Sequence, residues 1–193
     1  MVGPNDILRF WLDECKPEQW FIEDQNFDTQ IRNNFLETWQ KVAEGQFSLW
    51  LTHPNGVLAY IILTDQLPRN MFRSDSRAFS TDRAALAAAK SAISKGWDLR
   101  VDSHIRHFFY MPLEHSENLY DQDRAVRLIH ERLDNPKYLL HARAHREIIR
   151  QFGRFPHRNL IMKRKTTSVE QVHIDAGGYQ SVVRSLEKKD KAA

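Results

Sequence analysis

The sequence predicts an all-α fold, and three observations support this prediction. Apolar residues recur every three or four positions along most of the chain, whereas the strict alternation typical of strands is rare. Many of these segments begin with a residue that caps helices and end at a glycine. The 193 residues are 41% apolar and include 11 Phe, 5 Trp and 5 Tyr, which is enough for a folded core. We therefore expect about seven or eight antiparallel helices.

Two amphipathic helices are expected at the start of the chain. Asn5 or Asp6 can cap a short helix that runs through Leu12. A longer helix should extend from about Phe27 to Glu44, because apolar side chains lie on one face there. The residues of this face are Phe27, Ile31, Phe35, Trp39 and Val42.

The apolar run from Val57 to Leu63 predicts a buried central helix. Taken alone the run could be a buried strand, but no partner strand is visible. Pro68 cannot donate a backbone hydrogen bond, so the helix should stop near Leu67. Asp65 then lies in the last turn, where the helix dipole disfavours a negative charge. A carboxylate at this place should be paired or functional, and Arg69 is the obvious partner.

Five further helices have recognisable starting signals. Asn135 followed by Pro136 places a cap before a proline in the first turn, and Thr167 and Glu170 form a capping box. One domain should cover residues 1–178, and residues 179–193 should form a charged C-terminal tail that frays. The expected helices span about 82–95, 102–109, 116–133, 135–153 and 167–177.

Composition argues against several classes of protein. Cys15 is the only cysteine, so the chain has no internal disulfide, which fits a reducing compartment. The N-terminus lacks the pattern of a secretion signal, and the longest apolar run, seven residues, is far too short to cross a membrane. The net charge of +3 is too small to indicate nucleic-acid binding. We expect a cytoplasmic protein.

Three polar segments share a proline beside the end of an apolar element. These segments, the proline corners, are residues 63–73, 108–117 and 152–159. The first contains Pro68-Arg69-Asn70, and the third contains the similar run Pro156-His157-Arg158-Asn159. We expect the three corners to converge on one pocket.

Several long motifs also occur in a characteristic order over about the first 170 residues. They are Ile7–Trp11, Trp20-Phe21, Phe27-Asp28, Leu58–Arg73, Ala78-Phe79 with Asp82, Tyr110–Glu117 with Gln122, and His145–Asn159. Together they resemble the bacterial domain-of-unknown-function family DUF924. The resemblance implies a tetratricopeptide-like array of stacked helix pairs and implies no reaction. The chain departs from the family pattern at Met162-Lys163-Arg164, where leucine, glycine and arginine are usual. Because Lys163 stands at the position of the glycine, the resemblance does not imply a close approach of the backbone to a ligand there.

Arginines and asparagines of the corners are candidates for binding an anion. Arg69, Arg73 and Arg158 could hold a carboxylate or phosphate, because one guanidinium group can bind two oxygens of such an anion at once. Asn70 and Asn159 would add neutral donors. We also include Glu117 and Gln122 among the ligand-binding candidates. Gln122 lies on an apolar helix face and must find hydrogen-bond partners there.

The same arginines could instead tie helices together. Arg69 would then pair with Asp65, and Arg158 would pair with Glu117 or Asp82. Ion-pair networks that serve only the fold resemble binding sites closely, so both interpretations stay open.

Two histidines are candidates for acid–base catalysis. His115 and His157 follow proline corners, and a histidine titrates near neutral pH. Asp65 could orient one of them. Alternatively, both histidines cap or pack. His141 and His145 have the four-residue spacing of metal ligands, but no further group completes a site, so we expect no metal and no cofactor.

Two functions remain possible from the sequence. The first is a site for a small anionic ligand, which as an enzyme would suit hydrolysis or phosphoryl chemistry. The second is an interaction scaffold that binds a protein partner on a helical surface, with no catalytic activity. Nucleic-acid binding is disfavoured by the modest net charge.

Overall fold

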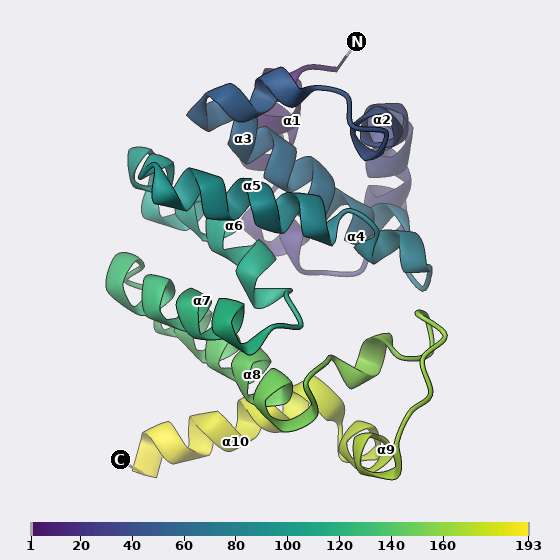
Figure 1. The fold of residues 1–193 in the computed structure, drawn as a ribbon, viewed down its shortest axis with the longest axis vertical. Helices are drawn as coiled ribbons and strands as arrows, with labels where there is room; N and C mark the ends of the chain where they lie inside the picture. Colours follow the sequence, from purple (N-terminus) through teal and green to yellow (C-terminus); the bar gives the residue numbers. More distant parts are fainter. Residues whose placement is uncertain (1, 193) are drawn as a thin grey trace. The chain divides into compact units, whose positions relative to one another are not determined.

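The computed structural model describes residues 2–192, which are 77% helical and contain no strand. The all-α prediction is therefore confirmed, whereas the tetratricopeptide-like arrangement stays a prediction. The chain divides into two compact units, Met1–Pro112 and Leu113–Ala193. The helices of each unit are labelled in Figure 1. A single domain over residues 1–178 also stays a prediction, because compactness alone does not show which part folds independently.

Unit 1 contains five α-helices and the larger part of a sixth. The second helix begins where Asp24 accepts hydrogen bonds from the N–H groups of Asn26 and Phe27, two residues earlier than we predicted. The helices are α1 (Pro4–Leu8), α2 (Gln25–Ala43), α3 (Pro54–Ile61), α4 (Leu67–Met71), α5 (Asp82–Ser94) and α6 (Ser103–Glu114).

An aromatic cluster forms part of the core of unit 1. Trp11 is fully buried, and its carbonyl oxygen accepts a hydrogen bond of 2.8 Å from the indole nitrogen of Trp20. The ring of Trp20 lies edge-on to Phe108 with centroids 4.9 Å apart. These contacts join the start of the chain to α6 and give the large rings a favourable geometry. Phe21, by contrast, is 58% exposed.

The central apolar run is helical, but the helix does not stop before Pro68 as predicted. A π-helical turn, Ile62–Gln66, follows α3, and Pro68 is the second residue of α4. An α-helix would have used the N–H of residue 68 to bond the carbonyl of Thr64. The hydroxyl of Thr81 makes that bond instead, at 2.6 Å. A side chain thus satisfies the carbonyl that proline leaves without a donor.

The other two prolines lie in different settings. Pro112 lies inside α6, two residues before the helix ends. Pro156 begins a short 3₁₀ turn, Pro156–Arg158, after α8 has ended at Gly153 with a left-handed φ of 69°. The three proline corners share a sequence pattern but are three different local structures.

Unit 2 is built on α8, which packs against α7 and α10. The last segment differs from our prediction, because residues 178–192 form a helix and not a tail. Tyr179 and Val182 of this helix pack against the core residues Ile148, Ile149 and Phe155, which explains why a highly charged segment is ordered. The helices are α7 (Leu119–Arg132), α8 (Pro136–Phe152), α9 (Ser168–Asp175) and α10 (Gly178–Ala192).

The hydroxyl of Thr81 should be needed for stability. Thr81 is 4% exposed, and besides its bond to Thr64 it accepts the indole N–H of Trp39 at 3.2 Å. Thr81→Val keeps the shape but leaves two buried polar groups without partners, so we expect a loss of about 2–3 kcal/mol in the free energy of unfolding. Urea unfolding measures it. Ser80→Ala, which removes an exposed hydroxyl, is the control and should cost less than about 0.5 kcal/mol. Equal losses in both variants would contradict this role.

Candidate functional site

In the first proline corner, Arg69 lies between two carboxylates. Its guanidinium is 3.5 Å from Asp65, which is completely buried, and 3.0 and 3.1 Å from the two carboxylate oxygens of Asp82. It also donates to the carbonyl of Asp65, the next carbonyl along from the one that Thr81 satisfies. The expected pairing of Arg69 with Asp65 is therefore present. Asp82, a suggested partner of Arg158, pairs with Arg69.

Asp28 organises the rest of this corner. Its carboxylate is 9% exposed and accepts a 2.9 Å hydrogen bond from the amide of Asn70. Arg73 binds both oxygens of the same carboxylate and also donates to the carbonyl of Ile22. Sequence reasoning did not include Asp28 among the site residues, although the Phe27-Asp28 motif contained the signal. The donors of Arg69, Asn70 and Arg73 are directed to carboxylates within unit 1, so a ligand anion would have to compete with them.

In unit 2, Glu117 is held by Arg164. The guanidinium donates to both carboxylate oxygens, at 2.6 and 3.0 Å, and the N–H of Phe155 donates at 2.8 Å. Burial acts to raise the pKa of Glu117, but these hydrogen bonds outweigh it and leave the pKa lowered. Arg164 was not among our candidates. Its partner Glu117 is 47 residues away in the sequence, so no local spacing indicated the pair.

Lys163, the residue before Arg164, has a left-handed φ of 54°. This conformation favours glycine. The chain makes the turn with a lysine.

Gln122 and Asn159 hold backbone segments in place. Gln122 is fully buried, and its amide nitrogen donates to the carbonyls of Glu114 and Ser116 at 2.6 and 2.7 Å, which satisfies the end of α6. Asn159 is 1% exposed and its amide lies 3.4 Å from the hydroxyl of Thr166. The prediction that buried Gln122 must find partners is confirmed, and these partners are backbone groups.

The remaining predicted residues of unit 2 meet around the ring of Phe155, which is 1% exposed. The guanidinium of Arg158 lies over this ring at 4.5 Å, and the rings of His145 and His157 are each centred 5.6 Å from it. His115 lies 6.2 Å from His145, centroid to centroid. We call His115, His145, Phe155, His157 and Arg158 the Phe155 cluster.

Tyr179 and Glu114 also contact His145. Tyr179 stacks on His145 with centroids 4.9 Å apart, and the Nδ1 of His145 is 3.6 Å from the buried carboxylate of Glu114. Burial, and then the charge of Glu114, raise the pKa of Tyr179. Its hydroxyl therefore keeps its proton and forms a hydrogen bond with the Nδ1 of His141. Among residues 2–192, no group of three or more His, Cys, Asp or Glu side chains could hold a metal ion.

The electrostatics of His157 set it apart from an ordinary surface histidine. The pKa of His157 is lowered to about 4, chiefly by reduced hydration of the ring and then by the neighbouring Arg158 and His145. His115 acts in the same direction, while Glu117 opposes them. His157 lies at the surface, where water screens the effect of these charges. At neutral pH the ring is uncharged and can accept a proton.

The predicted site residues thus form two groups, each described within its own unit. Asp65, Arg69, Asn70 and Arg73 belong to unit 1, and the others belong to unit 2. Convergence of the three corners on one pocket stays a prediction. None of the helices within residues 2–192 is both long enough and apolar enough to cross a membrane.

The model of the family described as bacterial protein of unknown function (DUF924) matches residues 7–178. The chain belongs to the DUF924 family. It is also similar to the solved structure of a protein of unknown function, ATU0120 from Agrobacterium tumefaciens, with 37% sequence identity and a TM-score of 0.84. That similarity covers 89% of this chain and 96% of the other. No curated protein matches the chain.

Loss of the Asp28 carboxylate should destabilise the protein. Asp28→Asn removes the counter-charge of Arg73 and weakens the contact with Asn70, so we expect a loss of about 2–3 kcal/mol in the free energy of unfolding, measured by urea denaturation. Asp75→Asn is the matched control, because Asp75 forms an exposed pair with Arg77 at 2.8 Å. That pair should contribute less than about 1 kcal/mol. If both variants lose equal stability, Asp28 has no special structural role.

Proposed function

We propose that the Phe155 cluster binds a small anion, such as a phosphate or a carboxylate, and that His157 accepts a proton when the anion binds. The observation that carries the proposal is the gathering of groups that can be positive around one buried aromatic ring. Arg158, His145 and His115 all disfavour protonation of His157, which is the electrostatic effect that a bound anion would reverse.

The ring of Phe155 helps to explain how such groups can lie together. The face of an aromatic ring attracts a guanidinium, and Arg158 lies over this face at 4.5 Å. Glu117, whose two oxygens are bound by Arg164, also interacts with Arg158 and offsets part of the positive charge. Glu114 provides a counter-charge next to His145. An added anion would find both positive charge and a neutral proton acceptor.

These groups would suit hydrolysis or phosphoryl transfer if the protein is an enzyme. The neutral ring of His157 could take a proton from an attacking water molecule, and Arg158 could stabilise negative charge that develops on the substrate. His115 would then be a candidate proton donor.

The proposal predicts that an anion raises the pKa of His157. We would follow the ring signals of His157 by NMR during pH titrations with and without inorganic phosphate or acetate. We expect a higher pKa with the bound anion, and a higher melting temperature. At about 100 times its dissociation constant a ligand adds about 2.7 kcal/mol of stability.

Variants of the Phe155 cluster test whether the anion binds there. His157→Asn and Arg158→Gln should lose the anion-dependent rise in melting temperature. His130→Asn and Arg127→Gln change exposed residues of α7 and serve as controls that should keep it. If all four variants respond to anions like the wild type, or if the pKa of His157 does not move, the Phe155 cluster is not an anion site.

A protein-interaction role is the second candidate. Apolar side chains are exposed in the segment that contains α9, where Leu160 is 88%, Val169 64% and Val172 68% exposed. Clusters of exposed apolar side chains often mark a contact surface. This observation favours the scaffold hypothesis without requiring any chemistry at the Phe155 cluster.

Charge introduced on α9 tests the second candidate. Val169 and Val172 are exposed, so replacing both by Lys should change the free energy of unfolding by less than about 0.5 kcal/mol. If α9 contacts a partner, the double variant should fail to retain a protein that the wild type captures from cell extract. Gln171→Lys adds charge to the same helix as a control. Identical capture by wild type and double variant would exclude this surface.

A further inference from the structure

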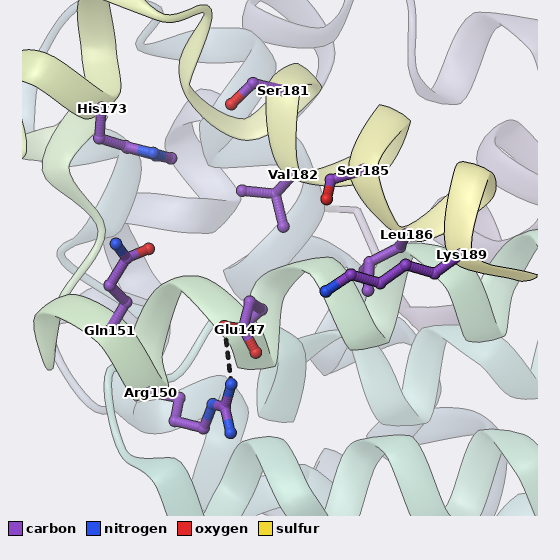
Figure 2. Close-up of a pocket in the computed structure, with 9 residues that line it drawn as sticks. All are labelled: Glu147, Arg150, Gln151, His173, Ser181, Val182, Ser185, Leu186 and Lys189. Atoms are coloured by element: carbon purple, nitrogen blue, oxygen red, sulfur yellow. Dashed lines mark hydrogen bonds and ion pairs between the residues drawn. The ribbon is translucent and has the colours of Figure 1, made fainter.

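A second candidate site lies among α8, α9 and α10 of unit 2, where a pocket has a volume of about 280 Å³ (Figure 2). Glu147 and Arg150 of α8 lie on one side of this pocket, and Ser185 and Lys189 of α10 lie on the other. His173 of α9 points toward it from one end. Three separate elements thus contribute side chains.

This pocket and the Phe155 cluster share no lining residue. An α-helix turns by roughly 100° per residue, so Glu147 and Arg150 lie roughly 200° and 140° around the axis from His145. The two sites can be tested separately.

Positive charge exceeds negative charge around the pocket. Arg150 is held in place by Glu147 at 2.9 Å, so these two charges balance. Lys189 adds a further positive charge, and within residues 2–192 it makes no ion pair. Burial lowers the pKa of His173, so its ring is neutral at neutral pH and can offer one donor and one acceptor.

The geometry of α10 places a hydroxyl beside this charge. Ser181, Ser185 and Lys189 are spaced four residues apart, so they lie in one row along the helix and all three line the pocket. Val182 and Leu186 of the same helix supply an apolar surface next to the row. Val182 also packs against the core, which fixes this surface in position.

We propose that this pocket binds a second small anion, one with a carboxylate or phosphate head and a short apolar body. Lys189 and Ser185 would hold the head, and Val182 and Leu186 would contact the body. The volume lies near the lower end of the roughly 300–1,000 Å³ range of small-molecule sites, so the ligand must be small. This site goes beyond the proposed function and does not depend on it.

The test uses inorganic phosphate and butyrate as probes. Their dissociation constants would be measured by calorimetry, and the ring signals of His173 would be followed by NMR. Removing a charge-assisted contact weakens binding by at least about tenfold, so we expect this loss for Lys189→Ala. Lys188→Ala removes the same charge from the neighbouring residue, which does not line the pocket, and should leave both constants unchanged.

A second variant keeps the test valid if the loss of charge alone has a small effect. Ser185→Leu retains Lys189 but fills the pocket, so butyrate should no longer bind while the protein stays folded. Tighter binding of butyrate would assign a carboxylate ligand, and tighter binding of phosphate would assign a phosphate ligand. Equal affinities in the Lys188→Ala and Lys189→Ala variants, or signals of His173 that do not move with either probe, would overturn the proposal.

The controls also separate this site from the Phe155 cluster. His157→Asn should leave binding at the α10 pocket intact, and Lys189→Ala should leave the phosphate-dependent pKa of His157 intact. If the proposal for one site is contradicted, the proposal for the other site is therefore unaffected.

Discussion

The carbonyl of Thr64, which Pro68 leaves without a backbone donor, constrains the centre of unit 1. A proline in a buried helix is tolerated only where another donor reaches that oxygen, since a buried carbonyl without a partner costs stability. Thr81 reaches it from the start of α5. Arg69 donates to the next carbonyl, that of Asp65, and the carboxylates of Asp65 and Asp82 neutralise its charge. The contact between the start of α5 and the central helix thus answers one missing N–H group.

The two units treat their arginines differently. In unit 1 the carboxylates of Asp28, Asp65 and Asp82 bind the guanidinium groups of the first corner. In unit 2, Arg164 binds the carboxylate of Glu117, and the guanidinium of Arg158 lies over the ring of Phe155. The acid–base chemistry that we propose belongs to unit 2, where the ring of His157 lies next to the same aromatic ring.

Most of the helical fold could be predicted from local signals. The start of α8 at Asn135 and Pro136, and the capping box at Thr167 and Glu170, depend on neighbouring residues only, and both are present. The helix through Pro68 could not be predicted in this way, because the donor that permits it, Thr81, is distant in sequence. Helix α10 was missed although Tyr179, Val182, Val183 and Leu186 have helical spacing, because the run of charged residues that follows them was interpreted as a solvated tail. Ion pairs between residues close in sequence could also be predicted, as Arg69–Asp65 was at a spacing of four residues. The pairs Asp28–Arg73 and Glu117–Arg164 could not, because each joins two distant segments.

The left-handed backbone at Lys163 bears on how this family can diverge. A side chain at such a position costs roughly 1–2 kcal/mol compared with glycine, so the turn must be stabilised by contacts elsewhere. The adjacent Arg164 supplies them through its bonds to Glu117 and to the carbonyl of Phe155. The turn at residue 163 therefore does not require a glycine. The ion pair of Arg164 with Glu117 can preserve a backbone path that glycine alone only makes easy.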